Sequence, residues 1–290
     1  MGRIVYLNGK FVDKSQAKIS VFDHGLLYGD GVFEGIRSYN RRVFQLKEHI
    51  DRLYRSAKAI SLRIPLTKRG MIKTVLEILK KNKLDDAYIR LVVTRGAGDL
   101  GLDPRKCTKF GVVFIIADRI ALYPREYYTK GLYIVTAKTR KNFLGAIDPR
   151  IKSLNYLNNI LAKIDGIKKN AQEAIMLTHE GYVSECTGDN IFIVKKECVY
   201  TPPRHLALEG ITRDIVIGIA RKKKIAFKEK KIVMKDVYGS DECFLTGTAA
   251  EIIPVIKVDN RRIGNGKPGC MTKVLLEEFR KLASKSGARY

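Results

Sequence analysis

The hydrophobic residues of this chain recur with two different periods, and the order of these periods constrains the fold more than any other feature. Residues 87–95 repeat at every second position, so Tyr88 and Arg90 are expected on the strand face opposite Ile89 and Leu91. Helical spacing appears at 47–60, 72–79, 157–164, 211–220 and 270–284, and further strands are predicted at 4–7, 11–12, 111–117, 132–138, 173–178 and 190–195. Strands and helices thus intermix without the strand–helix–strand rhythm of a parallel sheet, and the sequence predicts an α+β fold.

The length of 290 residues suits one large domain or two of ordinary size. Residues 119–131 contain Pro124 and a cluster of tyrosine and charged residues, a composition that is typical of a linker. We therefore expect a smaller N-terminal α+β domain at 1–118 and a larger C-terminal α+β domain at 132–290. Within the smaller domain, Asn8-Gly9 predicts a hairpin turn and the apolar run 111–117 predicts a buried strand.

Basic residues outnumber acidic ones by 55 to 30, which gives a formal net charge of +25. An excess of this kind is found in nucleic-acid-binding proteins. The densest basic runs, 221–224 and 228–231, have no interleaved aromatic residues on which bases could stack. We therefore expect a generally basic surface and no nucleic-acid partner.

The cysteines and histidines show no pattern that is typical of a metal site. The five cysteines include no Cys-x-x-Cys pair and the four histidines lack ligand spacing, which predicts reduced thiols and no bound metal. No stretch of 18 apolar residues occurs, so no membrane-spanning helix is expected. The N-terminal residues lack the apolar core of a signal peptide, and this predicts a cytoplasmic protein.

Four local features could carry chemistry, and all of them except Glu185 also have an ordinary structural explanation. Lys152 lies at the predicted start of a helix and could be an amine nucleophile, although most of the 55 basic residues are expected on the surface. Glu185 ends a predicted strand and is followed by small turn residues. The helix start at 210–212 and the turn at 246–251 could bind an anion through backbone amides, as many helix starts and turns can.

Seven segments together are more specific than any one feature: DHGLLYGDGVFEGIRSY (23–39), EHIDRLYRSA (48–57), AYIRLVVTRGAGDLGLDP (87–104), IKSLNYLNNILAK (151–163), YVSECTGDNIFIV (182–194), LEGITRD (208–214) and FLTGTAAEIIPV (244–255). In this order they resemble the class IV, fold-type IV pyridoxal-phosphate aminotransferases, and within them the branched-chain amino-acid aminotransferases. The resemblance implies a two-domain α+β fold that is D-amino-acid-aminotransferase-like. It also implies that pyridoxal 5'-phosphate binds between the domains and that the C-terminal domain carries the catalytic lysine.

The resemblance implies which residues bind this cofactor. Lys152 matches the lysine that forms a Schiff base with it and then moves the proton of the substrate Cα. Glu185 matches the carboxylate that pairs with the pyridine nitrogen, and Tyr156 matches the tyrosine that hydrogen-bonds the phenolic oxygen. Tyr156 follows Lys152 by four residues, so both would share a helical face if the helix has begun. The phosphate is expected to bind Arg52, Ile211, Thr212 and Thr248.

The residues that bind substrate are implied in the same way. The α-carboxylate is expected to bind the Tyr88 hydroxyl and the backbone amides of Thr248 and Ala249. Arg90 would receive the γ-carboxylate of glutamate, because strand periodicity places it on the same face as Tyr88. The remaining residues of the substrate pocket are expected to be the walls Tyr28, Phe33 and Tyr156 and an accessory polar group, Arg37.

The activity that the resemblance implies is a reversible, ping-pong aminotransfer between L-leucine, isoleucine or valine and 2-oxoglutarate, as used in branched-chain amino acid biosynthesis. Residues 32–37 and 88–90 favour the branched-chain group. A D-amino-acid aminotransferase or an aminodeoxychorismate lyase on the same fold is the alternative. The partners implied are small amino and 2-oxo acids and further copies of the chain, in a homodimer or a larger assembly of dimers.

Two departures from the family pattern affect the substrate and cofactor predictions. Cys186 follows Glu185 where the family commonly has glycine, and its bulk could tilt Glu185 or tighten the cofactor site. The linker carries Tyr123, Tyr127 and Tyr128, and the sequence leaves open which of them closes the pocket.

Overall fold

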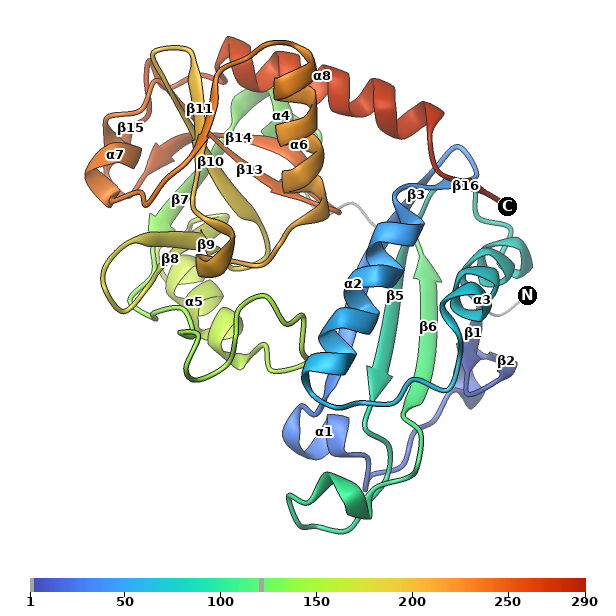
Figure 1. Cartoon of the computed structure of the whole chain (residues 1–290). Coiled ribbons are helices and arrows are strands. Elements are labelled where there is room, and N and C mark those ends of the chain that lie inside the picture. The colour runs from blue at the N-terminus through green and yellow to red at the C-terminus, as the bar shows by residue number, and fades with distance from the viewer. Residues whose placement is uncertain (1–2, 120–122) are drawn as a thin grey trace. The chain divides into compact units, whose positions relative to one another are not determined.

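The computed structural model describes residues 3–119 and 123–290, and it divides into two compact units (Figure 1). Unit 1 contains the residues up to 120 together with Ile151–Asn155 and Ala283–Tyr290, and unit 2 contains residues 121–150 and Tyr156–Leu282. Each unit combines a sheet with helices, so the expected two-domain α+β fold is confirmed. The segment that contains Lys152 is grouped with unit 1, whereas the sequence analysis expected it in the C-terminal domain.

Unit 1 is built on a seven-stranded sheet in the order β16-β4-β3-β5-β6-β1-β2. Its strands are β1 (Ile4–Leu7), β2 (Lys10–Asp13), β3 (Gly31–Tyr39), β4 (Arg42–Val43), β5 (Ala87–Thr94), β6 (Val112–Asp118) and β16 (Ala288–Arg289). Its helices are α1 (His24–Tyr28), α2 (Leu46–Ala59) and α3 (Lys68–Lys81), with short 3-10 turns at Lys14–Gln16 and Pro104–Lys106. The pairings between these strands are antiparallel, and the predicted hairpin joins β1 to β2 through Asn8 and Gly9, both at positive φ.

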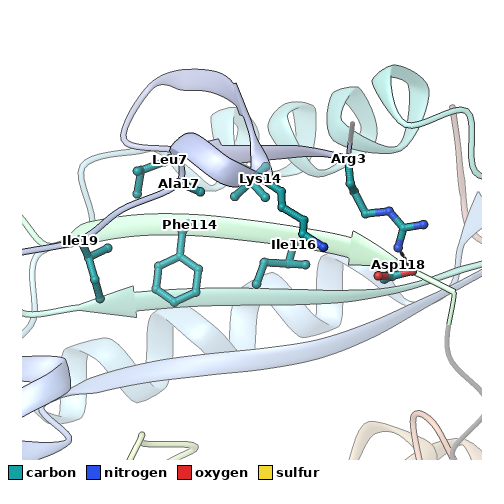
Figure 2. Close-up of a pocket in the computed structure, with 9 residues that line it drawn as sticks. Arg3, Leu7, Lys14, Ala17, Ile19, Phe114, Ile116 and Asp118 are labelled. Carbon is teal, nitrogen blue, oxygen red and sulfur yellow. Dashed lines mark ion pairs between the residues drawn. The ribbon is translucent and has the colours of Figure 1, made fainter. Parts of the chain in front are cut away.

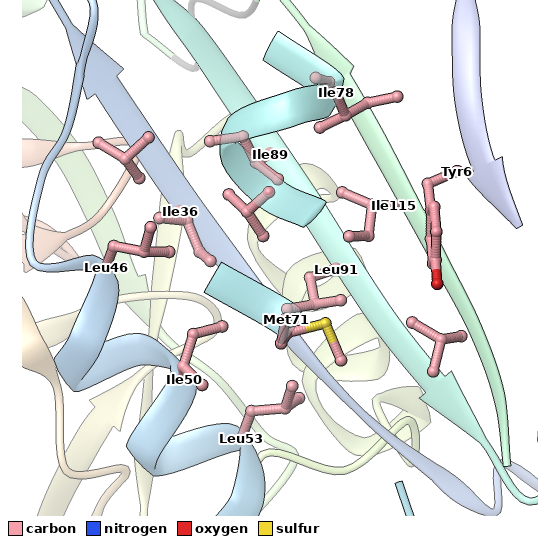
Figure 3. Packing of buried hydrophobic residues seen from close by; sticks show 14 of the residues in the cluster. Tyr6, Ile36, Leu46, Ile50, Leu53, Met71, Ile78, Ile89, Leu91 and Ile115 are labelled. Atoms are coloured by element: carbon pink, nitrogen blue, oxygen red, sulfur yellow. The ribbon is translucent and has the colours of Figure 1, made fainter. Parts of the chain in front are cut away.

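Helices α2 and α3 cover one face of this sheet because each carries an apolar stripe at helical spacing. Figure 3 shows the packing between Ile50, Leu53, Met71 and Ile78 of the helices and Ile36, Ile89, Leu91 and Ile115 of the sheet. These side chains are at most 1% exposed. Full burial of such a side chain contributes about 1.5–3 kcal/mol to folding, so this layer stabilises the sheet. Tyr88 and Arg90 lie on the opposite face of the same sheet.

Unit 2 contains a nine-stranded sheet in the order β12-β11-β10-β13-β14-β7-β8-β9, with β15 paired to β14. Its strands are β7 (Leu132–Thr136), β8 (Glu173–Leu177), β9 (Val183–Cys186), β10 (Asn190–Lys195), β11 (Cys198–Thr201), β12 (Phe227–Glu229), β13 (Glu242–Gly247), β14 (Glu251–Val258) and β15 (Arg261–Arg262). Its helices are α4 (Glu126–Lys130), α5 (Leu157–Ile167), α6 (Ile211–Lys222), α7 (Met234–Tyr238) and α8 (Cys270–Lys285), with a 3-10 turn at Arg204–Leu206. Helix α8 belongs to this unit up to Leu282.

Two predicted elements are present but bury different residues than expected. Strand β6 is buried on one face only: Val113 and Ile115 are fully covered, whereas Ile116 is 39% exposed. Helix α5 directs most of its apolar residues to the surface of unit 2 and buries Asn159 and Ala162 instead. Apolar periodicity shows which residues share a face, but it does not show whether that face is covered.

The expected linker is also partly structured. Residues 126–130 form α4, and the side chains of Tyr123, Tyr127 and Tyr128 pack against the core of unit 2. Residues 120–122, which are part of the same prediction, lie outside the described residues. No helix in the described part of the chain is long and apolar enough to cross a membrane.

Candidate active site

Three of the predicted substrate residues meet on one face of the unit 1 sheet. The antiparallel register places Gly35 of β3 opposite Arg90 of β5. Arg90 Nη2 donates a 3.1 Å hydrogen bond to the Tyr88 hydroxyl, and its guanidinium lies 4.8 Å from the centre of the Phe33 ring. A Cβ on Gly35 would overlap the Tyr88 hydroxyl, so glycine is required here for close approach. The prediction that Tyr88 and Arg90 share a face is therefore confirmed.

Lys152 lies beside Phe33 because its backbone extends the edge of β3. The Phe33 N–H donates to the Lys152 carbonyl at 3.0 Å, and the Leu154 N–H donates to the Gly31 carbonyl at 2.9 Å. The Lys152 N–H donates to the Ser56 hydroxyl of α2 at 3.1 Å. The half-buried ammonium lies 4.5 Å from the centre of the Phe33 ring. Backbone pairing thus anchors Lys152 next to predicted substrate residues and explains why its segment belongs to unit 1.

Tyr28 and Arg37 also belong to unit 1, but the structure gives them other contacts. Tyr28 ends α1, is 38% exposed, and donates a 2.6 Å hydrogen bond to the Leu100 carbonyl. The Arg37 guanidinium lies 4.7 Å from the centre of the Tyr39 ring. Their assignment to the substrate pocket stays a prediction.

Arg52, the predicted phosphate ligand, is held by a carboxylate that the sequence analysis did not single out. Its Nε and Nη2 atoms donate 2.7 Å hydrogen bonds to the two oxygens of Glu34, and His49 Nδ1 lies 2.8 Å from the same carboxylate. Glu34 is fully buried. Burial alone would raise its pKa, but the Arg52 charge and the hydrogen bonds outweigh that effect and lower the pKa to about 2. Glu34 therefore orients Arg52 from inside unit 1.

We expect Glu34→Gln to lower the free energy of unfolding at pH 7 by about 3 kcal/mol, because it leaves the buried Arg52 without its counter-charge. The folded-state pKa of Glu34 lies below the usual 4.5, so its contribution is present above pH 4.5 and is lost as pH falls towards 2. Urea unfolding should therefore show the gap between the two proteins closing across this pH range. The exposed Glu48→Gln serves as control, and a gap that does not depend on pH would contradict this account.

In unit 2, Glu185 is a buried carboxylate whose two oxygens both have partners. Lys141 Nζ lies 2.6 Å from Oε1, and both side chains are less than 10% exposed. The Leu208 N–H donates to Oε2 at 3.0 Å, and Asn190 Nδ2 donates to it at 3.3 Å. A carboxylate held in this way can accept a further hydrogen bond from a cationic ring N–H.

Tyr156 does not share a helical face with Lys152, because α5 begins only at Leu157. The sequence analysis placed Tyr156 and Lys152 on one helical face only if the helix had begun at Lys152, and it has not. Tyr156 is the residue directly before the helix, with φ −97° and ψ 5°. Its role as the partner of the cofactor's phenolic oxygen stays a prediction that depends on the resemblance alone.

The predicted phosphate-binding amides of unit 2 lie at a helix start and in a tight turn. Helix α6 begins at Ile211, and its N-cap, Gly210, contributes no side chain that could cover the Ile211 and Thr212 amides. Thr248 and Ala249 form the turn between β13 and β14. Both positions present backbone N–H groups of the kind that bind anions.

Cys186 points away from the side chain of Glu185, because neighbouring residues of a strand face opposite sides of the sheet. It is fully buried in the apolar cluster of unit 2, next to its strand partner Ile175. Burial, the largest effect, and the nearby carboxylates raise the pKa of its thiol well above the usual value. Cys186 therefore fills the core as a neutral group on the sheet face opposite Glu185, and its effect on Glu185 or on the cofactor site stays a prediction.

Unit 1 has a cavity of about 300 Å³ that none of the predicted site residues lines. Figure 2 shows the side chains around it. Apolar side chains of β1 and β6 line it, and Arg3 and Asp118 form an ion pair at one end. The exposed face of β6 explains this cavity. Two of its lining residues, Ile116 and Asp118, are the β6 partners of Arg90 and Tyr88, so the cavity lies on the same face of the sheet as the substrate cluster and next to it.

Sequence reasoning missed Lys141 and Glu34, which pair with predicted site residues. Lys141 is one of 55 basic residues, and no motif marked it. Glu34 lies inside a segment quoted for the resemblance but carried no role there. Of the two, only Glu34 could have been recognised from the sequence. A carboxylate among the apolar residues Val32, Phe33 and Ile36 of a strand requires a buried partner.

The sequence of this chain matches a known protein family and several known proteins. Residues 31–258 match the family model of class IV aminotransferases. A Methanocaldococcus jannaschii protein to which branched-chain-amino-acid aminotransferase activity is ascribed is 53% identical over 98% of both chains. A D-alanine aminotransferase of Staphylococcus epidermidis is 35% identical over 96% of both chains.

Solved structures agree with these sequence matches. A branched-chain amino acid aminotransferase in complex with pyridoxamine 5'-phosphate has a TM-score of 0.94 and 34% identity, and the match covers 98% of this chain and 95% of that chain. The branched-chain amino acid aminotransferase of Escherichia coli has a TM-score of 0.90 and 32% identity, and the match covers 99% of this chain and 96% of that chain. The similarity in fold thus extends over almost the whole chain.

Proposed function

This chain belongs to the class IV aminotransferase family, and we propose that Lys152 and Glu185 are the central residues of its active site. It catalyses the pyridoxal-phosphate-dependent transfer of an amino group between leucine, isoleucine or valine and 2-oxoglutarate. The observation in the fold that best supports this substrate pair is the Arg90–Tyr88 pair over the Phe33 ring. A cation beside an apolar aromatic wall suits both a charged and an apolar side chain.

The residues present fit a cofactor with a basic ring nitrogen and a phosphate. Glu185 is a buried, oriented carboxylate, and the start of α6 offers backbone amides for an anion. The Thr246 hydroxyl is buried and has no hydrogen-bond partner among the described residues. Thr246 of β13 is paired with Asn190 of β10, so the Thr246 hydroxyl lies on the same sheet face as the Asn190 side chain. Asn190 donates a hydrogen bond to Glu185. Unmet polar groups of this kind are typical of a ligand site.

When bound, the cofactor supplies an electron sink that makes the Cα proton of the substrate acidic. We propose that the primary amine of Lys152 would hold the cofactor covalently and would be released when the amine of the substrate takes its place. The free amine would then move the proton between the substrate Cα and C4′ of the cofactor. Glu185 holds the proton at the ring nitrogen, and Tyr156 donates to the phenolic oxygen. Arg52, Ile211, Thr212 and Thr248 bind the phosphate, with Arg52 kept in place by Glu34.

The proposed substrate residues of unit 1 include Phe33, Tyr88 and Arg90, which share one face of β3 and β5. We propose that the Tyr88 hydroxyl and the amides of Thr248 and Ala249 bind the α-carboxylate. Arg90 binds the γ-carboxylate of glutamate, and Phe33, Tyr28 and Tyr156 contact the branched side chains. An unpaired carboxylate against an apolar wall costs several kcal/mol, and Arg90 removes that cost.

Arg90→Met should raise the KM for glutamate and 2-oxoglutarate by ~10²-fold, equivalent to ~2.7 kcal/mol, because the γ-carboxylate loses its cation. The half-reaction with leucine should change much less, since the apolar wall is retained. Stopped-flow half-reactions with each donor measure both values, with Arg69→Met on the exposed side of α3 as control. Equal losses for leucine and glutamate would show that Arg90 has a structural role instead.

Profiling of L- and D-amino donors tests the activity itself. Transfer from L-leucine, L-isoleucine and L-valine is expected, with D-alanine a poor donor. Preference for D-alanine would favour the alternative that the Staphylococcus epidermidis relative represents. Pyruvate formed from aminodeoxychorismate would favour the lyase.

We further propose that the enzyme acts in the cytoplasm as a homodimer or a larger assembly of dimers. Support comes from the resemblance and from several apolar side chains that are exposed on the single chain. Leu100 and Leu102 are 69% and 79% exposed, and Leu157 of α5 is 67% exposed. Large apolar side chains with this exposure on a single chain are candidates for contact with a partner. Light scattering of the purified enzyme tests the assembly, and a monomer at micromolar concentration would refute it.

A further inference from the structure

Lys141 is a buried lysine on the loop after β7, and it belongs to no motif in the sequence. Its Nζ lies 2.6 Å from Glu185 Oε1, and its side chain is 8% exposed. The second contact of Nζ is Asn159 Oδ1 of α5, at 3.5 Å. Asn159 is itself fixed, because its Nδ2 donates to the Thr187 carbonyl at 2.7 Å. The ammonium is therefore directed at Glu185 by a buried side chain of the helix.

The backbone around Lys141 is also fixed. The Lys141 N–H donates to the Leu177 carbonyl of β8 at 2.9 Å. Asn158 Nδ2 donates to the Arg140 carbonyl at 2.8 Å, and the Asn142 N–H donates to Asn158 Oδ1 at 3.3 Å. These bonds attach the loop to β8 and α5 on both sides of Lys141, so its position is determined by the fold of unit 2.

The surroundings of the pair are acidic. Asp189 is buried near both Glu185 and Glu173, and Glu173 accepts a hydrogen bond from Thr187. Burial and the Glu173 charge raise the pKa of Asp189 well above its usual range. Lys163 lies 3.8 Å from Glu173. Lys141, in contrast, contacts Glu185 itself. Without Lys141, the buried Glu185 carboxylate would lose its cation while Asp189 remains near it.

We infer that Lys141 is a positioning residue, which fixes the Glu185 carboxylate in the orientation that the cofactor's ring nitrogen requires. The inference rests on the proposed role of Glu185. Lys141 holds Oε1 while Leu208 and Asn190 hold Oε2, so the carboxylate plane cannot rotate. Its remaining lone pair is then available to the ring N–H in one direction only. Lys141 acts through Glu185 and does not itself contact the reacting atoms.

The test compares two cofactors on the apo-protein. One is pyridoxal 5'-phosphate, and the other is its 1-deaza analogue, in which CH replaces the ring nitrogen. Lys141→Met should weaken binding of pyridoxal phosphate by about 10- to 100-fold, the range for a hydrogen bond to a charged group. Binding of the deaza analogue should change less than about threefold, because it has no ring N–H for Glu185. Lys141→Arg should restore most of the affinity, and the control Lys163→Met should leave both affinities near wild type.

Equal losses for the two cofactors would show that Lys141 only supports the fold, and would overturn the inference. Wild-type affinity in Lys141→Met would overturn it as well, while the proposed function would stand. If wild-type protein binds no pyridoxal phosphate, both the proposed function and this inference fail.

A second comparison remains decisive if Lys141→Met does not fold. The double variant Lys141→Met/Glu185→Gln replaces the buried ion pair by two neutral side chains, a change that proteins often tolerate. If Lys141 acts through Glu185, the double variant should bind pyridoxal phosphate as Glu185→Gln does, within about threefold. A further tenfold loss in the double variant would overturn the inference.

Discussion

Lys152→Ala should abolish transamination, with a loss of at least ~10⁴-fold, the upper range for removal of a general acid–base. The variant lacks the only group in the proposed mechanism that can both attach the cofactor and move the Cα proton. The fold should survive, because the Lys152 backbone hydrogen-bonds to Phe33 and Ser56, and alanine keeps these bonds.

The measurement has two parts. Borohydride treatment followed by mass spectrometry should fix the cofactor on Lys152 in the wild-type enzyme and leave the variant unlabelled. The exposed Lys58→Ala of α2 serves as control and should behave as wild type in labelling and turnover. Near-normal turnover in a correctly folded Lys152→Ala would refute the assignment.

Glu185→Gln should lower turnover by about 10² to 10³ at full cofactor occupancy, as for other preorganised electrostatic groups. Glutamine keeps the volume and an acceptor for Leu208 and Asn190, but it removes the charge that keeps the ring nitrogen protonated. The loss should therefore appear in both half-reactions, with leucine and with glutamate.

Single-turnover kinetics under saturating pyridoxal phosphate separate this effect from weaker cofactor binding. Glu180→Gln, at an exposed turn of unit 2, is the matched control for loss of one negative charge. Unchanged turnover in Glu185→Gln would mean that another acid supports the ring nitrogen. The variant also leaves Lys141 without its counter-charge, so its thermal stability should be reported beside the kinetics.

Local sequence patterns predicted most of the secondary structure. The hairpin at Asn8-Gly9, the alternating strand at 87–95 and the helix that opens at Ile211 all appear where their patterns placed them. These elements depend on turn chemistry, strand alternation and helical spacing, which act over a few neighbouring residues. The same alternation placed Tyr88 and Arg90 on one face, which is the part of the candidate site that spacing alone could predict.

Predictions failed where they required knowledge of what covers a surface. The apolar run of β6 is buried on one face only, and α5 buries Asn159 while Leu157 is exposed. Burial of Asn159 follows from its bonds to Lys141 and Thr187, which lie 18 and 28 residues away. The helical geometry assumed for Tyr156 failed for a related reason, because the chain at Lys152 is held as an extra edge on β3 and cannot be helical there.

The sequence by itself determined the α+β class, the five longest helices, seven of the strands and, through the resemblance of seven segments, the family and the residues that are candidates for catalysis. Only the tertiary structure decided how those residues are held. It paired Glu34 with Arg52 across 18 residues, and Lys141 with Glu185 across helix α5 and strand β8. A buried charge requires a partner, but any of the many basic residues could satisfy that requirement, and the choice is made by which backbone segments the fold brings within hydrogen-bond distance.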